Sequence, residues 1–184
     1  MFKFIETKIK GVFLIEPQVF ADSRGDFMET YNEKEFQAVG LNYRFVQDNQ
    51  NSSMKGVLRG LHFQTIHQQA KLGRALLGEV FDVAVDLRRG SPTYGQWVGE
   101  VLSQENGKML MIPRGFAHGV LALSDTAIFA YKCDDFFHPE EDDGIRWDDP
   151  TIGITWPDVK IILSEKDQKR KTLKEHPVEL EAFL

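Results

Sequence analysis

Short hydrophobic segments recur along the chain, and turn residues separate them. In residues 79–87 every second side chain is large and hydrophobic, and the alternate positions are mixed; the first set is Phe81, Val83, Val85 and Leu87, and the second is Val80, Asp82, Ala84 and Asp86. Successive side chains of a strand point to opposite faces. We therefore expect a strand with one face in the core and the other lining a mixed or polar space.

Comparable segments follow one another at short intervals over most of the chain. Those predicted to be strands are 12–16, 27–31, 45–49, 57–63, 71–77, 79–87, 96–102, 108–112, 119–123 and 127–133. No long helical pattern separates them, and such a series of short strands is typical of a β-sandwich or β-barrel. The predicted fold class is therefore all-β, with a few short helices.

Two short helices are expected outside the strands. Asn32 is a favourable N-cap, with Glu35 as its capping-box partner and Gly40 as the residue that ends the helix. Ser164 is a second N-cap and is followed three positions later by Asp167. Residues 1–184 are predicted to form one domain with a charged C-terminal extension from about residue 164, which is either loose or an arm against a partner chain.

Composition narrows the functional classes. The net charge is -6 and the pI is about 5.4, which disfavours nucleic-acid binding because phosphates require a basic surface. The single cysteine excludes an internal disulfide. The start of the chain lacks the apolar core of a signal peptide, and no apolar run approaches the roughly 18 residues of a membrane span. We therefore expect a cytoplasmic protein that does not associate with membranes.

Two histidines stand in recognisable surroundings. His62 lies in an apolar strand segment, where it suits either a core histidine with a satisfied hydrogen bond or a catalytic one. His118 ends the pattern P-x-G-x-x-H, which resembles the second conserved motif of the cupin superfamily. Metal-binding cupins also supply an H-x-H pair and a glutamate, but the segment around His62 contains one histidine. Because a catalytic metal site typically needs three protein ligands, we predict no bound metal.

Several blocks match one family in order along the chain. The block Arg-Gly-Leu-His-Phe-Gln at 59–64 resembles the R-G-L-H-x-Q motif of dTDP-4-dehydrorhamnose 3,5-epimerases. Further blocks similar to that family are 19–27, 45–49, 78–86, 91–95, 113–119, 131–133, 145–150 and 163–167. Each block alone is a weak signal, whereas the ordered set is specific.

The resemblance implies a jelly roll of the cupin type (a double-stranded β-helix) without metal or cofactor, which acts as a homodimer. It implies a dTDP-linked 4-keto-6-deoxy hexose as substrate and inversion of C3 and C5 of dTDP-4-dehydro-6-deoxy-glucose, a step of dTDP-L-rhamnose biosynthesis. The hydrogens beside a ketone are acidic because the carbanion becomes an enolate. Inversion then requires a base on one face, a group that stabilises the enolate oxygen, and an acid on the opposite face.

Four residues match the catalytic positions of the family. His62 corresponds to the base, Asp167 to the carboxylate that orients it, Lys71 to the cation at the enolate oxygen, and Tyr131 to the acid. Histidine titrates near neutral pH, and a phenol can deliver a proton to an enolate. Each of these residues, taken singly, also has a purely structural interpretation. Asp167 could cap a helix, Lys71 could be a solvated surface residue, and Tyr131 could belong to the hydrophobic core. Their joint match favours catalysis.

The resemblance also implies the residues that contact the substrate. Arginines suit the diphosphate because they form paired, charge-assisted hydrogen bonds, and an aromatic ring can stack on thymine. In the family, the segment 24–29 reaches into the partner's site. From the sequence alone, Phe27 could instead pack in the core and Arg24 could lie in a solvated turn. The matching positions are Arg24, Phe27, Glu29, Gln47, Asn49 and Arg59, with His118 as a residue that contacts the substrate or supports one that does.

The chain departs from the family at one place. Phe136 and Phe137 stand where many members have a tyrosine pair, and residues 134–135 are unusually acidic. This difference leaves open a relative that inverts a single carbon or uses another 4-keto sugar nucleotide. Two further alternatives are a non-catalytic sugar-binding cupin, which would not need the four polar residues, and a metal-dependent cupin, which would need the H-x-H pair.

Overall fold

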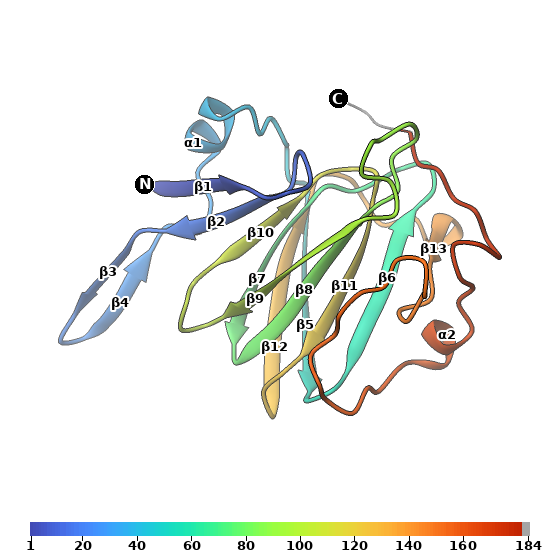
Figure 1. Cartoon of the computed structure of the whole chain (residues 1–184). Coiled ribbons are helices and arrows are strands. Elements are labelled where there is room, and N and C mark those ends of the chain that lie inside the picture. Colours follow the sequence, from blue (N-terminus) through green and yellow to red (C-terminus); the bar gives the residue numbers. More distant parts are fainter. Residues whose placement is uncertain (182–184) are drawn as a thin grey trace.

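Two antiparallel sheets face each other in the computed structural model, which describes residues 1–181 (Figure 1). The strand order of the first sheet is β1 (Phe2–Glu6), β2 (Phe13–Pro17), β10 (Met109–Ile112), β7 (Lys71–Leu77), β12 (Thr126–Cys133) and β5 (Gln47–Met54). The order of the second is β13 (Asp142–Gly144), β6 (Leu58–Gln64), β11 (Phe116–Ala122), β8 (Glu79–Asp86) and β9 (Trp97–Ser103). The predicted jelly roll is confirmed.

The bounds of most predicted strands agree with the observed bounds to within a few residues. The exceptions are polar strands and strands outside the two main sheets or at their edges. Strand β7 has the predicted bounds, whereas β5 begins two residues later than expected and continues to Met54. Every second side chain of β5 is exposed, and the side chains between them, on the inner face, are polar. The sequence QDNQNSSM therefore shows no hydrophobic alternation. The strand predicted at 27–31 ends at Met28, and β1, β3 (Val19–Asp22) and β13 were not predicted.

Both faces of β8 are buried, so the chain has two main hydrophobic clusters. Val80 and Ala84 point between the two sheets, where they pack with Leu110 and Phe129. The opposite face, which was predicted to be the core, lies under the C-terminal part of the chain. Partly buried tryptophans pack against this face, whose members are Phe81, Val83, Val85 and Leu87. The mixed face therefore lines the interior of the jelly roll, as its polar residues indicated.

The helices are where the sequence predicted them. The first, α1 (Glu33–Ala38), has Asn32 as N-cap, and Gly40 follows it with a positive φ of 86°. Glu35 does not form the predicted capping box: its carboxylate instead accepts hydrogen bonds from the backbone nitrogens of Met1 and Phe2 and so fixes the first strand. The second, α2 (Glu165–Gln168), begins after the predicted N-cap, Ser164.

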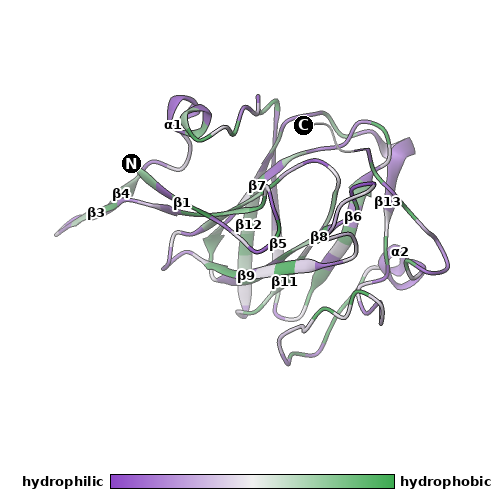
Figure 2. Ribbon diagram, turned by 45° about the horizontal axis from the view of Figure 1, so that its top comes forward, coloured by the Kyte–Doolittle hydropathy of each residue, from purple (hydrophilic) through white to green (hydrophobic). Residues whose placement is uncertain are grey.

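The C-terminal part of the chain packs back on its own second sheet as far as the structure describes it. Leu173 and Leu180 are buried there, and the Tyr94 hydroxyl donates to the carbonyl of Val178. In Figure 2 α2, next to this part of the chain, is mostly hydrophilic. Residues 182–184 of the predicted extension lie outside the described residues. None of the helices within residues 1–181 has the length and apolar character needed to cross a membrane.

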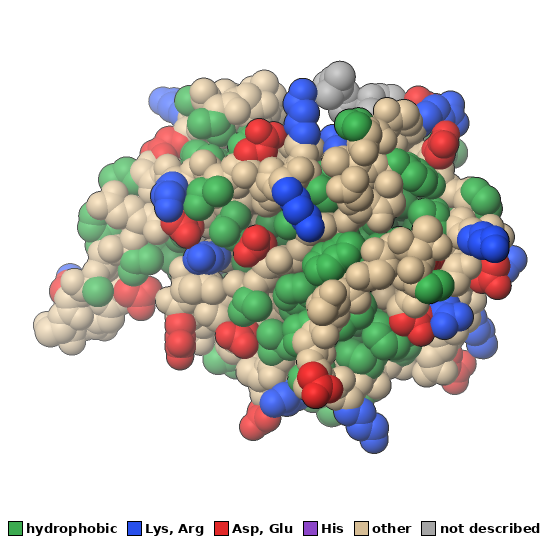
Figure 3. Space-filling model, viewed as in Figure 1, with side chains coloured by type: hydrophobic (Ala, Val, Ile, Leu, Met, Phe, Trp, Pro, Cys, Tyr) green, Lys and Arg blue, Asp and Glu red, His purple; other side chains and the backbone are tan. Residues whose placement is uncertain are grey.

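One hairpin projects from the body of the molecule. It consists of β3 and β4 (Gly25–Met28) and extends to the left in Figures 1 and 3. Hydrophobic side chains lie along it, and Val19, Phe20 and Phe27 are 47%, 44% and 66% exposed. Because large hydrophobic side chains gathered on a surface commonly mark an interaction site, the hairpin is a candidate contact surface.

Candidate active site

A cavity of about 510 Å³ opens between the two sheets and contains the four predicted catalytic residues. His62 is on β6 of the second sheet, whereas Lys71 and Tyr131 are on β7 and β12 of the first. Asp167 lies in α2, beside β6. A larger hollow of about 850 Å³ lies under the C-terminal part of the chain and contains none of these four residues. The smaller cavity is therefore the candidate active site.

His62 and Asp167 form a hydrogen-bonded pair in this cavity. The Nε2 atom of His62 lies 2.6 Å from Oδ1 of Asp167, which is only 4% exposed. Burial raises the pKa of this carboxyl, but hydrogen bonds from His62 and Ser164 outweigh burial and leave the pKa below its ordinary value. The ionised carboxylate accepts, so Nε2 carries the proton and Nδ1 is left as the basic nitrogen.

Asp167 also takes part in the helix cap, so the two alternatives from the sequence are both present. Its Oδ2 accepts a hydrogen bond from the Ser164 hydroxyl at 2.9 Å, and its backbone nitrogen donates to Ser164 Oγ at 3.1 Å. Each carboxylate oxygen thus has one partner, and the cap fixes the carboxylate against the histidine.

Lys71 and Tyr131 lie close together on the first sheet. In the register of β7 and β12, Lys71 is opposite Cys133 and Tyr131 is opposite Gly73, so the two side chains share the inner face. Burial lowers the pKa of Lys71 and raises that of Tyr131. The phenol is therefore protonated throughout the neutral range. An amine and a phenol thus face His62 from the opposite sheet.

His118 lies beside His62 but has a different partner. The two histidines are neighbours across β6 and β11, and both line the cavity. The Nε2 atom of His118 lies 2.6 Å from Oδ1 of Asp82, which is fully buried. The His118 ring also packs against Tyr131, with 6.1 Å between the ring centres. His118 therefore lies next to two of the four predicted catalytic residues.

The predicted substrate-binding residues fall into two groups. Arg59 lines the cavity, and its guanidinium donates to Ser53 Oγ at 3.2 Å. Gln47 and Asn49 lie on β5, where Asn49 is directly opposite Tyr131 and therefore shares its inner face. The remaining three are at the projecting hairpin or just after it, outside the cavity of their own chain, and they are Arg24, Phe27 and Glu29.

The structure adds three polar residues that the sequence did not single out. Asp82 pairs with His118, Ser164 with Asp167, and Gln64 joins two segments at the cavity wall. An aspartate inside an apolar strand was a signal for Asp82, but its partner depends on the register of β8 and β11. Ser164 appeared only as a helix cap, and Gln64 only as the last residue of the R-G-L-H-x-Q block.

Comparison with known proteins agrees with this arrangement. The family model described as dTDP-4-dehydrorhamnose 3,5-epimerase matches residues 6–175. The chain belongs to this family. A dTDP-4-dehydrorhamnose 3,5-epimerase of Methanothermobacter thermautotrophicus is 57% identical over 97% of the chain and 98% of its own length. One from Pseudomonas aeruginosa is 56% identical over 89% of the chain and 91% of its own length.

A solved structure of this epimerase family has nearly the same fold. The dTDP-6-deoxy-D-glucose-3,5-epimerase of Legionella pneumophila, in complex with dTDP-4-keto-L-rhamnose, superposes with a TM-score of 0.95. The two chains are 46% identical, and each is covered over 100% of its length. The family resemblance predicted from the ordered sequence blocks is thus confirmed, together with the cupin-type jelly roll.

Proposed function

We propose that the protein is a 3,5-epimerase of dTDP-4-dehydro-6-deoxy-glucose that yields dTDP-4-dehydro-rhamnose for dTDP-L-rhamnose biosynthesis. One observation carries the proposal: a base oriented by a carboxylate and a phenol line one cavity from opposite sheets. A hexose between the sheets would present one face to each group. The family and the ligand of the Legionella structure support the choice of a dTDP-linked sugar.

The proposed chemistry uses only proton transfers. Nδ1 of His62 removes the hydrogen from the carbon beside the ketone, and the electron pair forms the enolate. The ammonium of Lys71 stabilises the negative charge that develops on the enolate oxygen. The hydroxyl of Tyr131 then gives its proton to the opposite face of the same carbon, and solvent restores both groups. The same sequence serves C3 and C5.

Deuterium incorporation tests this function directly. The tag-free protein is incubated with dTDP-4-dehydro-6-deoxy-glucose in D2O, and NMR follows each carbon separately. The expected result is label at both C3 and C5 with inversion of each. Label and inversion at one carbon only would assign a single-carbon epimerase, the alternative connected with Phe137, which lines the cavity. No label would contradict the proposal and favour a non-catalytic sugar-binding protein.

Replacement of Lys71 by methionine removes the proposed enolate cation and keeps most of the side-chain volume. We expect kcat to fall about 10²–10³-fold, the usual effect of losing one group that stabilises a developing oxyanion. Steady-state kinetics with the same substrate measure the effect. Lys3→Met is the matched control, because Lys3 pairs with Glu16 on the exposed edge of the first sheet. Equal activity of both variants would remove Lys71 from the mechanism.

We also propose that the active form is a homodimer in which each hairpin completes the partner's cavity. The hairpin residues do not line the cavity of their own chain, and the Arg24 side chain at the tip is 87% exposed, with Asp22 as its ion-pair partner. The exposed hydrophobic side chains of β3 and β4 are suited to contact with a second chain. Arg24 would then bind the diphosphate and Phe27 the thymine.

Mixed dimers provide a specific test of this arrangement. One parent carries His62→Ala and the other carries Arg24→Ala with Phe27→Ala, and the two are unfolded and refolded together. If the hairpins cross, one site of each mixed dimer has an intact base and an intact hairpin, so about a quarter of wild-type activity returns. Activity no higher than that of the hairpin variant alone would show that each hairpin serves its own chain.

A further inference from the structure

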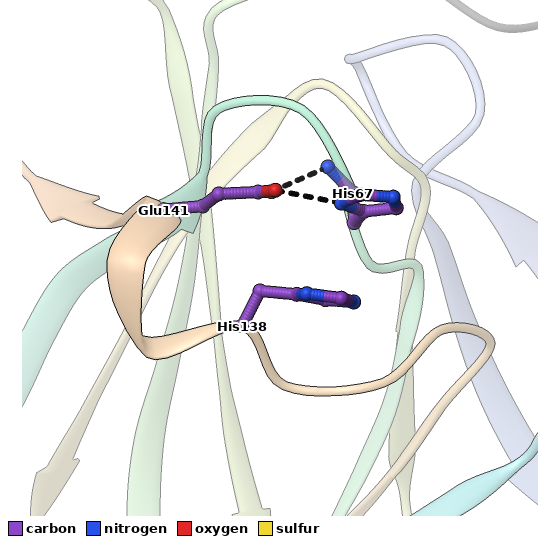
Figure 4. Close-up of side chains that lie close together, drawn as sticks. All are labelled: His67, His138 and Glu141. Carbon is purple, nitrogen blue, oxygen red and sulfur yellow. Dashed lines mark hydrogen bonds and ion pairs between the residues drawn. The ribbon is translucent and has the colours of Figure 1, made fainter.

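Three side chains at the rim of the molecule form a compact group of potential metal ligands (Figure 4). His67 is in the loop between β6 and β7, His138 precedes the short helix η1 (Pro139–Glu141), and Glu141 ends that helix. One ligand atom of each residue lies within 4.8 Å of the other two. The proposed epimerase mechanism uses none of the three, so their arrangement requires a separate account.

The carboxylate of Glu141 is already fixed toward His67. Its Oε2 accepts from the backbone nitrogen of His67 at 2.7 Å, and its Oε1 lies 2.7 Å from Nδ1 of the same residue. The Glu141 side chain is only 9% exposed, whereas that of His67 is 48% exposed. One carboxylate oxygen is thus held by the backbone, and the other faces an imidazole nitrogen that solvent can reach.

His138 supplies the second imidazole. Its ring stacks on that of His67 with 4.1 Å between the ring centres and 15° between the planes. Two ligands of a tetrahedral zinc ion, each about 2.1 Å from the metal, lie about 3.4 Å apart. To bind one ion together, the two stacked rings would have to turn about their side-chain bonds until one nitrogen of each reaches this separation.

We propose that His67, His138 and Glu141 bind a zinc ion through two imidazole nitrogens and one carboxylate oxygen, with water as the fourth ligand. Imidazole donors favour zinc and its transition-metal neighbours, whereas magnesium and calcium prefer sites made only of oxygen. This site is distinct from the cavity of His62 and does not rest on the proposed epimerase activity.

The ion would join two segments that form one wall of the active-site cavity. Gln64, which lines the cavity, accepts from the backbone nitrogen of His138 at 2.7 Å and donates to the carbonyls of Phe136 and His67. Phe137 lines the same cavity. A metal bridge from His67 to His138 and Glu141 would therefore stabilise the loop after β6 against the segment after β12.

Calorimetric titration of chelator-treated, tag-free protein with zinc chloride tests the proposal. We expect one zinc ion per chain and a higher melting temperature, because a ligand that binds only the folded state stabilises it. Affinity should fall on acidification, since the hydrogen bond to Glu141 raises the pKa of His67 and the metal must displace that proton. Glu141→Gln should weaken binding about tenfold or more, and His67→Ala with His138→Ala should abolish it.

Two control variants separate this site from other possibilities. Glu105→Gln removes an exposed carboxylate outside the cluster and should leave zinc affinity unchanged. His62→Asn should also leave it unchanged, which excludes binding in the catalytic cavity. Stoichiometric binding that persists in the double histidine variant, or that is lost with His62→Asn, would overturn the proposal. Circular dichroism checks that each variant is folded. None of these outcomes depends on a measurement of epimerase activity.

Discussion

Replacement of His62 by alanine is expected to lower kcat for epimerisation about 10²–10⁴-fold, the range typical of a general base. The reason is that Nδ1 of His62 is the free basic nitrogen in the cavity, because Nε2 is engaged by Asp167 at 2.6 Å. Deuterium incorporation at C3 and C5 should fall by the same factor. The fold should persist, since the His62 side chain is 35% exposed and contributes little to the core.

Two further variants define the cause of that loss. Asp167→Asn removes the charge that orients the imidazole and should lower kcat about tenfold or more without loss of the α2 cap, because an amide oxygen can still accept from Ser164. His176→Ala is the matched control: His176 pairs with Asp143 at 2.7 Å and lies outside the cavity. Unchanged deuterium exchange in His62→Ala would assign the base to another residue.

Tyr131→Phe is expected to separate proton removal from inversion. The variant loses the proton donor of the first sheet and keeps the base of the second, so inversion should fall about 10²–10⁴-fold. His62 can still remove a proton, exchange it with solvent and return it to the same face. NMR in D2O should therefore show label at the reacting carbons with retained configuration. Loss of label and inversion together would mean that the phenol also assists the first step.

A matched control keeps this result specific to the cavity. Tyr43→Phe makes the same chemical change at a tyrosine that packs near Phe36 and Phe45 and does not line the cavity. It should retain both label and inversion. A similar loss in both variants would indicate a general effect on folding, not removal of the acid.

Much of the fold was predictable because apolar alternation marks strands that have a face in the core. The pattern located β7 and β8 closely, but it indicated only the first residues of β5, because the inner face of that strand is polar. The hairpin of β3 and β4 was also hard to predict, because neither face of it is buried within the chain.

The candidate site was predictable by resemblance and not by spacing. His62 and Asp167 are 105 positions apart, and nothing local indicates that they meet. Similarly, the pairing of His118 with Asp82 depends on strand register, which the sequence specifies only through long-range contacts. The cluster of His67, His138 and Glu141 is of the same kind, since its members join two loops that the sequence does not connect.

The position of Asp167 has a consequence for biosynthesis of the protein. All the strands of the two facing sheets precede this residue, so they are synthesised before the carboxylate. A chain that stops short of α2 would contain every strand of both sheets and yet lack the carboxylate that orients the base. Orientation of the base would therefore depend on a segment that is synthesised after both sheets.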